Sequence, residues 1–282
     1  MAEIGKTNRM KVVKKVDFGV FLDGGHWGEI LLPRRYVPKN CGPGDFVEVF
    51  LYLDSEDRII ATTEKPLAGV GDFAWLRVVS IEPAGAFLDW GLKKDLLVPF
   101  REQKKKMEPG KSYVVFVYFD EMSRRIAASA RLEKFLEKAP AGLREGDEVD
   151  LLIYEQTALG FKAVIDGRYS GLLFANEIHQ RLKIGQRVRG YIKKVRRDGK
   201  IDLALNKSGQ GVDEDLEEDI LNILTKRGGF LALSDKSSPG DISALFKVSK
   251  KTYKKAIGSL YKKRMIVVED GGIRLREKTG DK

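Results

Sequence analysis

Short runs in which apolar and polar residues alternate fill residues 1–207. The clearest runs are Phe46 to Phe50, Tyr113 to Phe119 and Val188 to Ile192, and turn residues such as Asp198-Gly199 stand between the runs. Alternation with a period of two is typical of strands with one buried face, and short strands at close spacing favour a small barrel or sandwich. This part of the chain is therefore predicted to be all-β.

Three stretches of the chain share one spacing of glycine and apolar residues. Each opens with a glycine, has a proline or phenylalanine fourteen residues later that closes an apolar triplet, and has a second glycine eleven residues further on. The three sets are Gly19, Pro33 and Gly44, then Gly85, Pro99 and Gly110, then Gly160, Phe174 and Gly185. Two offsets that coincide in three copies indicate internal repeats. We therefore expect three successive domains at residues 1–65, 67–138 and 140–207.

Residues 213–282 follow a different pattern, after a polar joint at residues 206–211. Their apolar residues recur with the 3.6-residue period of a helix. The first such stripe consists of Leu216, Ile220, Ile223 and Leu224. Gly228-Gly229 is expected to end this first helix, and residues 239–246 are expected to form a second. A hairpin is predicted around Gly271-Gly272, because apolar strands flank this pair of turn residues.

A third helix is predicted after Ser249, whose side chain is a good N-cap. The residues expected to face the core are Tyr253, Ala256, Ile257, Leu260 and Tyr261, and lysines line the opposite side at Lys251, Lys254, Lys255 and Lys262. Three helices and a hairpin make a winged helix, with the third helix where a recognition helix sits. The lysines could contact phosphates, or the domain could instead mediate protein contacts or orient the barrels.

The first repeat contains the string Phe18-Gly19-Val20-Phe21-Leu22-Asp23 and, later, Arg58-Ile59. These residues resemble the S1 domain, a five-stranded oligonucleotide/oligosaccharide-binding (OB) barrel of ribosomal and RNA-degrading proteins. Phe87-Leu88-Asp89 with Arg125-Ile126 resembles it too, and the third repeat does so more weakly. The resemblance implies a multidomain, mainly β fold of three tandem S1-like OB-fold barrels followed by an α+β winged helix. It further implies that Phe18, Phe21 and Arg58 lie on an RNA-binding surface.

Strand alternation gives an independent view of these phenylalanines. Phe21 stands on the polar face of its strand, so that its ring can stack on an unpaired base. Phe87 is its counterpart in the second repeat. Alternation alone places Phe18 on the core face, unless Gly19 introduces a bulge that turns it outward. The alternative is that all three rings fill the barrels.

The repeats depart from the S1 pattern at two places. S1 domains commonly have a histidine where this chain has Pro33, Pro99 and Phe174. In the third repeat Lys162 replaces the stacking aromatic, and basic residues surround a predicted hairpin tip at Lys193, Lys194, Arg196, Arg197 and Lys200. Such a cluster can hold phosphates without reading sequence, as can Arg58 and Arg125 of the first two repeats. The alternative is a merely solvated hairpin.

The composition adds constraints on function. The 282 residues have a formal net charge of +10, which favours a polyanionic partner. One cysteine excludes an internal disulfide, and with only two histidines the chain has few ligands for a metal enzyme, so no cofactor is expected. Without a signal peptide or a long apolar run, the protein is predicted to be cytoplasmic and to have no membrane partner.

The order of the domains extends the resemblance to the whole chain. Three S1-like units followed by a winged helix with the string Val248 to Gly258 resemble the conserved virulence factor B family. This resemblance implies a bacterial RNA-binding protein, not known as a catalyst, that influences gene expression, including virulence determinants.

Three hypotheses for the function remain open. The first is non-catalytic binding of single-stranded RNA along the row of barrels and the basic winged helix. The second is a duplex-DNA-binding transcriptional regulator led by the winged helix, with the barrels as accessory domains. The third is an RNA-processing enzyme, which is the weakest because binding modules account for every segment and no carboxylate cluster has metal-ligand spacing.

Overall fold

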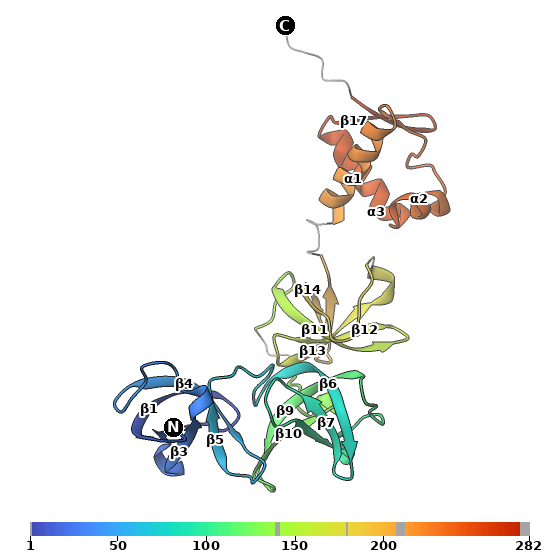
Figure 1. Cartoon of the computed structure of the whole chain (residues 1–282). Helices are drawn as coiled ribbons and strands as arrows, with labels where there is room; N and C mark the ends of the chain where they lie inside the picture. Colours follow the sequence, from blue (N-terminus) through green and yellow to red (C-terminus); the bar gives the residue numbers. More distant parts are fainter. Residues whose placement is uncertain (1, 139–141, 179, 207–211, 277–282) are drawn as a thin grey trace.

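The computed structural model describes residues 2–138, 142–178, 180–206 and 212–276, and within these ranges the chain forms three closed barrels and a small helical domain (Figure 1). Barrel 1 consists of β1 (Thr7–Val16), β2 (Gly19–Asp23), β3 (Glu29–Pro33), β4 (Phe46–Leu53) and β5 (Ile59–Thr62). Barrel 2 consists of β6 (Phe73–Glu82), β7 (Gly85–Asp89), β8 (Leu96–Pro99), β9 (Ser112–Asp120) and β10 (Arg125–Ser129). Barrel 3 consists of β11 (Glu148–Thr157), β12 (Gly160–Ile165), β13 (Tyr169–Phe174), β14 (Arg187–Val195) and β15 (Ile201–Ala204). The predicted three tandem barrels are confirmed.

The three barrels have one strand order. In barrel 1, β1 pairs with β2 and β4, β2 pairs with β3, and β4 pairs with β5. The parallel pairing of β3 with β5 closes the ring. Barrels 2 and 3 repeat this order, with β8–β10 and β13–β15 as the parallel pairs. Closure pairs every strand on both sides, which is the arrangement of a small OB barrel.

The repeated glycine begins the second strand of each barrel, where two backbones approach closely. A Cβ atom added to Gly19, Gly85 or Gly160 would lie 2.2, 2.2 or 2.0 Å from a carbonyl oxygen of the neighbouring strand. Only a residue without a Cβ atom fits there unless the backbone moves. This steric requirement explains why the glycine recurs at the same place in all three repeats.

Barrels 1 and 2 share one hydrophobic cluster. Phe50 and Tyr52 of β4 are buried together with the interior residues of barrel 2, and the Phe50 ring meets Trp90 edge-on at 5.7 Å between centroids. Across the same joint, Lys94 Nζ donates a hydrogen bond to the carbonyl oxygen of Asp54 at 2.6 Å. The two barrels are therefore held together by packed side chains as well as by the linker.

Barrels 2 and 3 meet through a second cluster. Phe73 on β6 packs in this cluster with Leu152 on β11 and Val164 on β12. Arg187 Nη2 on β14 donates a hydrogen bond to the Phe73 carbonyl oxygen at 2.8 Å. Both joints bury outward-facing positions of the strands, so part of each outer surface is not available to a ligand.

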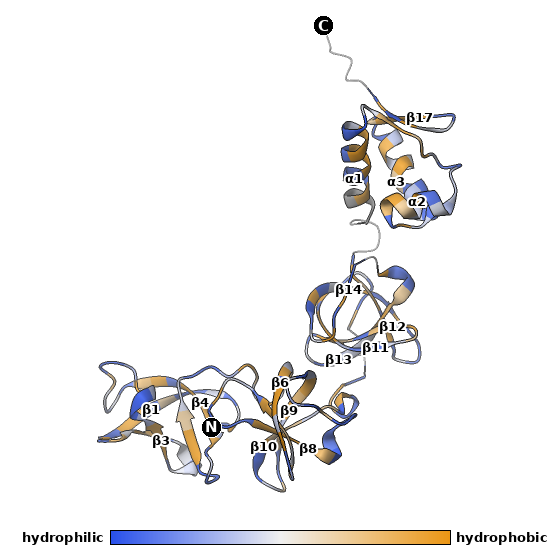
Figure 2. Cartoon of the chain, turned by 45° about the vertical axis from the view of Figure 1, so that its right-hand side comes forward, coloured by the Kyte–Doolittle hydropathy of each residue, from blue (hydrophilic) through white to orange (hydrophobic). Residues whose placement is uncertain are grey.

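The C-terminal domain is the predicted winged helix. It consists of α1 (Val212–Lys226), β16 (Phe230–Leu231), α2 (Pro239–Phe246), α3 (Lys250–Lys262), β17 (Ile266–Glu269) and β18 (Gly272–Leu275). The strands form one sheet in the order β16, β18, β17. Figure 2 shows hydrophobic residues on α1 and α3, which pack in one core. Of the predicted joint at residues 206–211, residues 207–211 lie outside the described residues.

The core of the winged helix follows the helical period with one exception. Ser249 caps α3 by accepting a hydrogen bond from the Thr252 backbone N–H. The buried residues of α3 are Tyr253, Ala256, Ile257 and Leu260. Tyr261, predicted to face the core, is instead 57% exposed. It stands at the edge of the apolar stripe, one residue before α3 ends, where the core no longer covers it.

Candidate nucleic-acid interface

Phe18 lies in the turn between β1 and β2 and not within a strand. Because β1 ends at Val16 and β2 begins at Gly19, the alternation that predicts an inward side chain does not extend to Phe18. Its ring is 60% exposed and meets the half-buried Phe21 ring edge-on at 6.2 Å between centroids. The inward placement of Phe18 is therefore wrong, and its ring does not fill barrel 1.

Phe21 lies on the outer face of β2, as its alternation predicts. Its neighbours Val20 and Leu22 are buried, whereas Phe21 remains partly exposed. Lys14 Nζ lies 4.6 Å from the centroid of the Phe21 ring, in a cation–π contact, and also forms an ion pair with Glu29. The outer face of barrel 1 thus presents an aromatic ring and an ammonium group side by side.

Two arginines that the sequence analysis did not single out lie at the same end of this face. Arg34 and Arg35 directly follow β3, and the backbone N–H of Arg34 donates to the Phe18 carbonyl oxygen at 2.8 Å. Both side chains are exposed, and neither forms an ion pair with a described residue. Their signal in the sequence is the dibasic pair that follows Pro33, the position where S1 domains commonly have a histidine.

Arg58 lies on the hairpin between β4 and β5 and is held by carboxylates. Its Nε and Nη2 donate to Asp54 Oδ2 at 2.9 and 2.7 Å, and its Nη1 lies 2.9 Å from Glu56 Oε2. The hydrogen bond to Asp54 raises the pKa of Arg58 above its ordinary value. Two carboxylates offset the charge that Arg58 would offer to a phosphate, and its role in RNA binding stays a prediction.

Phe87 takes the place of Phe21 in barrel 2. Its neighbours Ala86 and Leu88 are buried, and Phe87 is half-buried on the outer face of β7. The ring lines a pocket of about 380 Å³ between barrel 2 and the β4–β5 hairpin of barrel 1, where Tyr52 and Asp57 form part of the wall. The predicted aromatic platform of barrel 2 is therefore partly enclosed by its neighbour.

Arg125 binds a carboxylate of barrel 1. Its Nη2 forms an ion pair with Asp57 Oδ2, and Lys94 Nζ donates to Asp57 Oδ1 at 3.1 Å. The hydrogen bond from Arg125, supported by that from Lys94, holds the pKa of Asp57 below its ordinary value although partial burial opposes it. One aspartate thus offsets part of the charge of two cations at the rim of the Phe87 pocket.

The basic hairpin of barrel 3 connects β14 and β15, as predicted. Three of its cations form ion pairs, namely Lys193 with Glu177, Arg196 with Asp202 and Lys200 with Asp198. Lys194 and Arg197 are exposed and have no ion-pair partner in the described ranges. Lys162, at the position of Phe21, forms an ion pair with Glu155 at 3.0 Å. Barrel 3 therefore offers charge but no aromatic platform at this position.

The predicted lysines of α3 lie on the side of the helix that faces away from the core. All four are exposed, namely Lys251, Lys254, Lys255 and Lys262. Lys254 Nζ lies 3.6 Å from Asp235 Oδ2. Because α3 has the place of a recognition helix, this face is a candidate phosphate contact, and that role stays a prediction.

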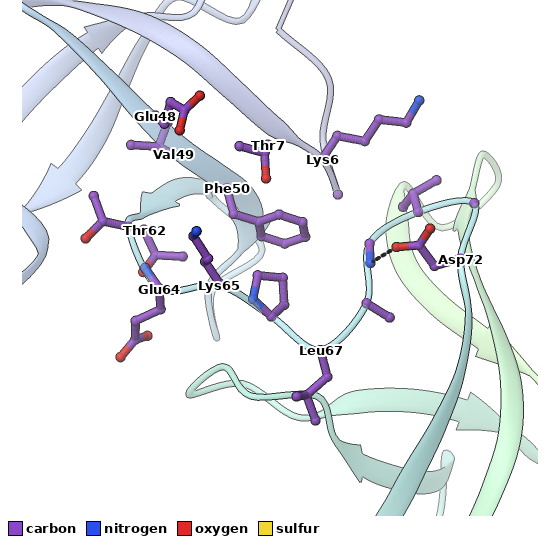
Figure 3. Close-up of a pocket in the computed structure, with 17 residues that line it drawn as sticks. Lys6, Thr7, Glu48, Val49, Phe50, Thr62, Glu64, Lys65, Leu67 and Asp72 are labelled. Carbon is purple, nitrogen blue, oxygen red and sulfur yellow. Dashed lines mark hydrogen bonds between the residues drawn. The ribbon is translucent and has the colours of Figure 1, made fainter. Parts of the chain in front are cut away.

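A hollow of about 740 Å³ lies between barrel 1 and the linker to barrel 2 (Figure 3). Its lining includes the cations Lys6 and Lys65 and the acids Glu48, Glu64 and Asp72. Asp72 Oδ2 accepts a hydrogen bond from the Gly69 backbone N–H at 2.8 Å, which fixes one side of the linker. Charges of both signs do not select a polyanion, so this hollow lacks the electrostatic character of a nucleic-acid-binding site.

Within the described ranges, no group of three or more histidine, cysteine, aspartate and glutamate side chains could hold a metal ion. No helix in those ranges is both long and apolar enough to span a bilayer. Cys41 is a half-buried free thiol, and burial raises its pKa above the ordinary value.

Comparison with known families assigns the two kinds of domain. Residues 4–64 and 70–129 each match the S1 domain, and residues 218–275 match the CvfB-like winged helix domain. Barrel 3 lies outside these ranges but has the same strand order as the two matched barrels.

Similar proteins align over most of the chain. Protein YitL of Bacillus subtilis (strain 168) is 29% identical over 274 residues, which are 95% of this chain and 92% of that protein. Conserved virulence factor B of Staphylococcus saprophyticus is 25% identical over 248 residues, which are 83% of this chain and 81% of that protein. A crystal structure from Streptococcus pneumoniae, described as a multidomain protein with nucleic acid binding domains, is 23% identical, has a TM-score of 0.42, and covers 97% of this chain and 98% of that one.

S1 and winged-helix domains are nucleic-acid-binding domains, so the matched families support nucleic-acid binding by this chain. The chain thus contains two S1 domains, a third barrel of the same strand order and a CvfB-like winged helix, and its predicted resemblance to the conserved virulence factor B family is confirmed.

Proposed function

We propose that this protein binds single-stranded RNA without catalysing a reaction, and that it thereby influences bacterial gene expression after transcription, including virulence determinants. The supporting observation is the Phe18–Phe21 ring pair on the outside of barrel 1, next to Lys14. Rings outside the core can stack on unpaired bases, while exposed Arg34 and Arg35 can neutralise phosphates.

Single strands suit this surface better than a duplex. In a duplex each base is already stacked between its neighbours, and its flat face is not accessible to Phe21 or Phe87. The preference for RNA over DNA rests on the S1 domains, whose relatives occur in ribosomal and RNA-degrading proteins. A cytoplasmic location would place the protein with its proposed ligand.

A competition assay tests this proposal. Labelled single-stranded RNA bound to the full chain is displaced by unlabelled single-stranded RNA or by duplex DNA of equal phosphate count. We expect the RNA to displace the label at lower concentrations, because only unpaired bases can stack on the exposed rings. Added salt should weaken binding, with a log–log slope of about −0.7 for each phosphate contacted.

Duplex DNA as the better competitor would overturn the proposal. It would instead favour a transcriptional regulator led by the winged helix, with the barrels as accessory domains. That alternative is supported by the exposed lysine face of α3, which includes Lys251 and Lys262.

Replacing Asp57 with asparagine is expected to strengthen RNA binding about threefold to tenfold, because more positive charge then faces the phosphates. The carboxylate of Asp57 pairs with both Arg125 and Lys94. For the same reason Arg125→Ala should weaken binding less than Arg34→Ala, since only Arg34 lacks a carboxylate partner in the described ranges. Fluorescence anisotropy with one labelled RNA measures all three variants.

Glu218→Gln is the matched control for Asp57→Asn. It removes one negative charge from an exposed side chain on α1 that has no ion pair in the described part of the chain. An equal gain from both variants would mean that net charge alone matters, and that Asp57 does not restrain the two cations.

A further inference from the structure

The pocket between barrels 1 and 2 places an aromatic ring and a carboxyl group on one face. In the antiparallel pair of β7 and β8, Phe87 is opposite Leu97 and Leu88 is opposite Leu96. Leu88 and Leu96 are buried, so Phe87 and Leu97 belong to the outer face of the two strands. Asp95 directly precedes β8 and lines the same pocket as Phe87, so one planar ligand can contact both the ring and the carboxyl group.

Asp95 has no partner in the described ranges, in contrast to its counterpart in barrel 1. The equivalent residue of barrel 1 is Glu29, which forms an ion pair with Lys14. Barrel 2 has Ser80 at the position of Lys14, opposite Phe87 in the ladder. Asp95 forms neither a hydrogen bond nor an ion pair with a described residue, although it is half-buried in the pocket lining. The pocket therefore contains an acceptor without a donor.

The groups that act on the Asp95 carboxyl are acidic. Burial, followed by the nearby carboxylates of Asp89 and Glu82, raises the pKa of Asp95 above its ordinary value. The cations of the pocket lining, Lys94 and Arg125, are both paired with Asp57. Acidic groups in the lining repel a phosphate, whereas they attract the N–H groups of a neutral base.

Among the four RNA bases, guanine matches an ionised carboxyl group best. A carboxylate only accepts hydrogen bonds, and it can accept two at once. The Watson–Crick edge of guanine has two adjacent donors, the N1–H and the N2 amino group. Adenine and cytosine have one amino group next to an acceptor nitrogen, and uracil has one N–H between two carbonyl oxygens. A carboxylate therefore discriminates against the other three bases.

We propose that the pocket binds an unpaired guanine base of single-stranded RNA, with its ring stacked on Phe87 and its Watson–Crick edge hydrogen-bonded to Asp95. The inference rests on the proposed function and adds a base preference to it. We expect no guanine preference in barrel 1, because the carboxylate of Glu29 already forms an ion pair with Lys14.

Anisotropy measurements with four oligonucleotides test the inference on the full chain. Each is a uridine oligomer with a single central guanosine, inosine, adenosine or uridine. We expect guanosine to bind about tenfold more tightly than adenosine, the effect of a hydrogen bond to a charged group. Inosine, which lacks the N2 amino group, should bind more weakly than guanosine to the unmodified protein, so this comparison requires no variant.

Asp95→Asn should abolish the preference for guanosine, so that the affinities for the guanosine and adenosine oligonucleotides become nearly equal. The ratio is the relevant quantity, since loss of a negative charge alone would strengthen binding to every RNA equally. Glu29→Gln, the same change at the matching position of barrel 1, should leave the ratio unchanged.

The outcomes separate the two proposals. If no oligonucleotide binds, the proposed function fails. If all four bind equally, or if Asp95→Asn keeps the preference, RNA binding stands and the guanine pocket is overturned.

Discussion

A chain in which Phe21 and Phe87 are both replaced by alanine is expected to bind single-stranded RNA about a hundredfold more weakly than the wild type. Stacking of one base on an aromatic ring contributes about 1–3 kcal/mol, and the variant removes one platform from each of two barrels. Both rings lie on outer faces, next to buried Val20 and Leu22 in one case and Ala86 and Leu88 in the other. The barrels should therefore remain folded, as circular dichroism can verify.

Phe46→Ala is the control for that variant. Phe46 is 57% exposed on β4 and lies under the Arg9 guanidinium at 5.0 Å, so it is also an exposed ring beside a cation. It is not on β2 or β7, and its removal should not change RNA affinity. Unchanged affinity in a folded Phe21/Phe87 variant would show that these rings are not the platform.

Gly19→Ala is expected to destabilise barrel 1 by about 2–3 kcal/mol. The added methyl group would lie 2.2 Å from the Leu32 carbonyl oxygen, which belongs to the backbone of β3 and cannot rotate away. Relief of this contact requires the ladder between β2 and β3 to open. Hydrogen exchange of the full chain, followed by mass spectrometry, should show faster exchange in peptides of barrel 1.

Gly42→Ala serves as the comparison within the same barrel. No atom lies within 4 Å of a Cβ added to Gly42, so exchange in barrel 1 should stay at the wild-type rate. Equal exchange in the Gly19 and Gly42 variants would contradict the steric explanation for the repeated glycine.

The fold was largely predictable because its signals are local and repeated. The fourteen-residue spacing arises because Gly19 of β2 pairs with Pro33 of β3 in the antiparallel ladder. Gly85 and Pro99 form the same pair in barrel 2. The exceptions are at element ends. Phe18 lies in a turn, where strand alternation does not apply, and Tyr261 lies in the last turn of α3, where helical period no longer decides burial.

The candidate interface was less predictable because charge depends on partners that are distant in sequence. Arg125 was predicted as a cation for phosphates, but its partner Asp57 is 68 residues away and belongs to another barrel. No spacing rule connects these two positions. Arg34 and Arg35 could have been found as a dibasic pair, yet their exposure and lack of ion pairs emerge only from the arrangement of the described residues.

The Phe50–Trp90 contact fixes the distance between the proposed RNA contacts of barrels 1 and 2. Two domains on a flexible linker would sample many distances between Phe21 and Phe87, whereas packed barrels keep that distance constant. A nucleotide captured at one site then presents the next part of the strand to the other at a high effective concentration. Avidity would thus depend on the number of nucleotides between the contacted bases, with an optimum length that a flexible pair of domains would not have.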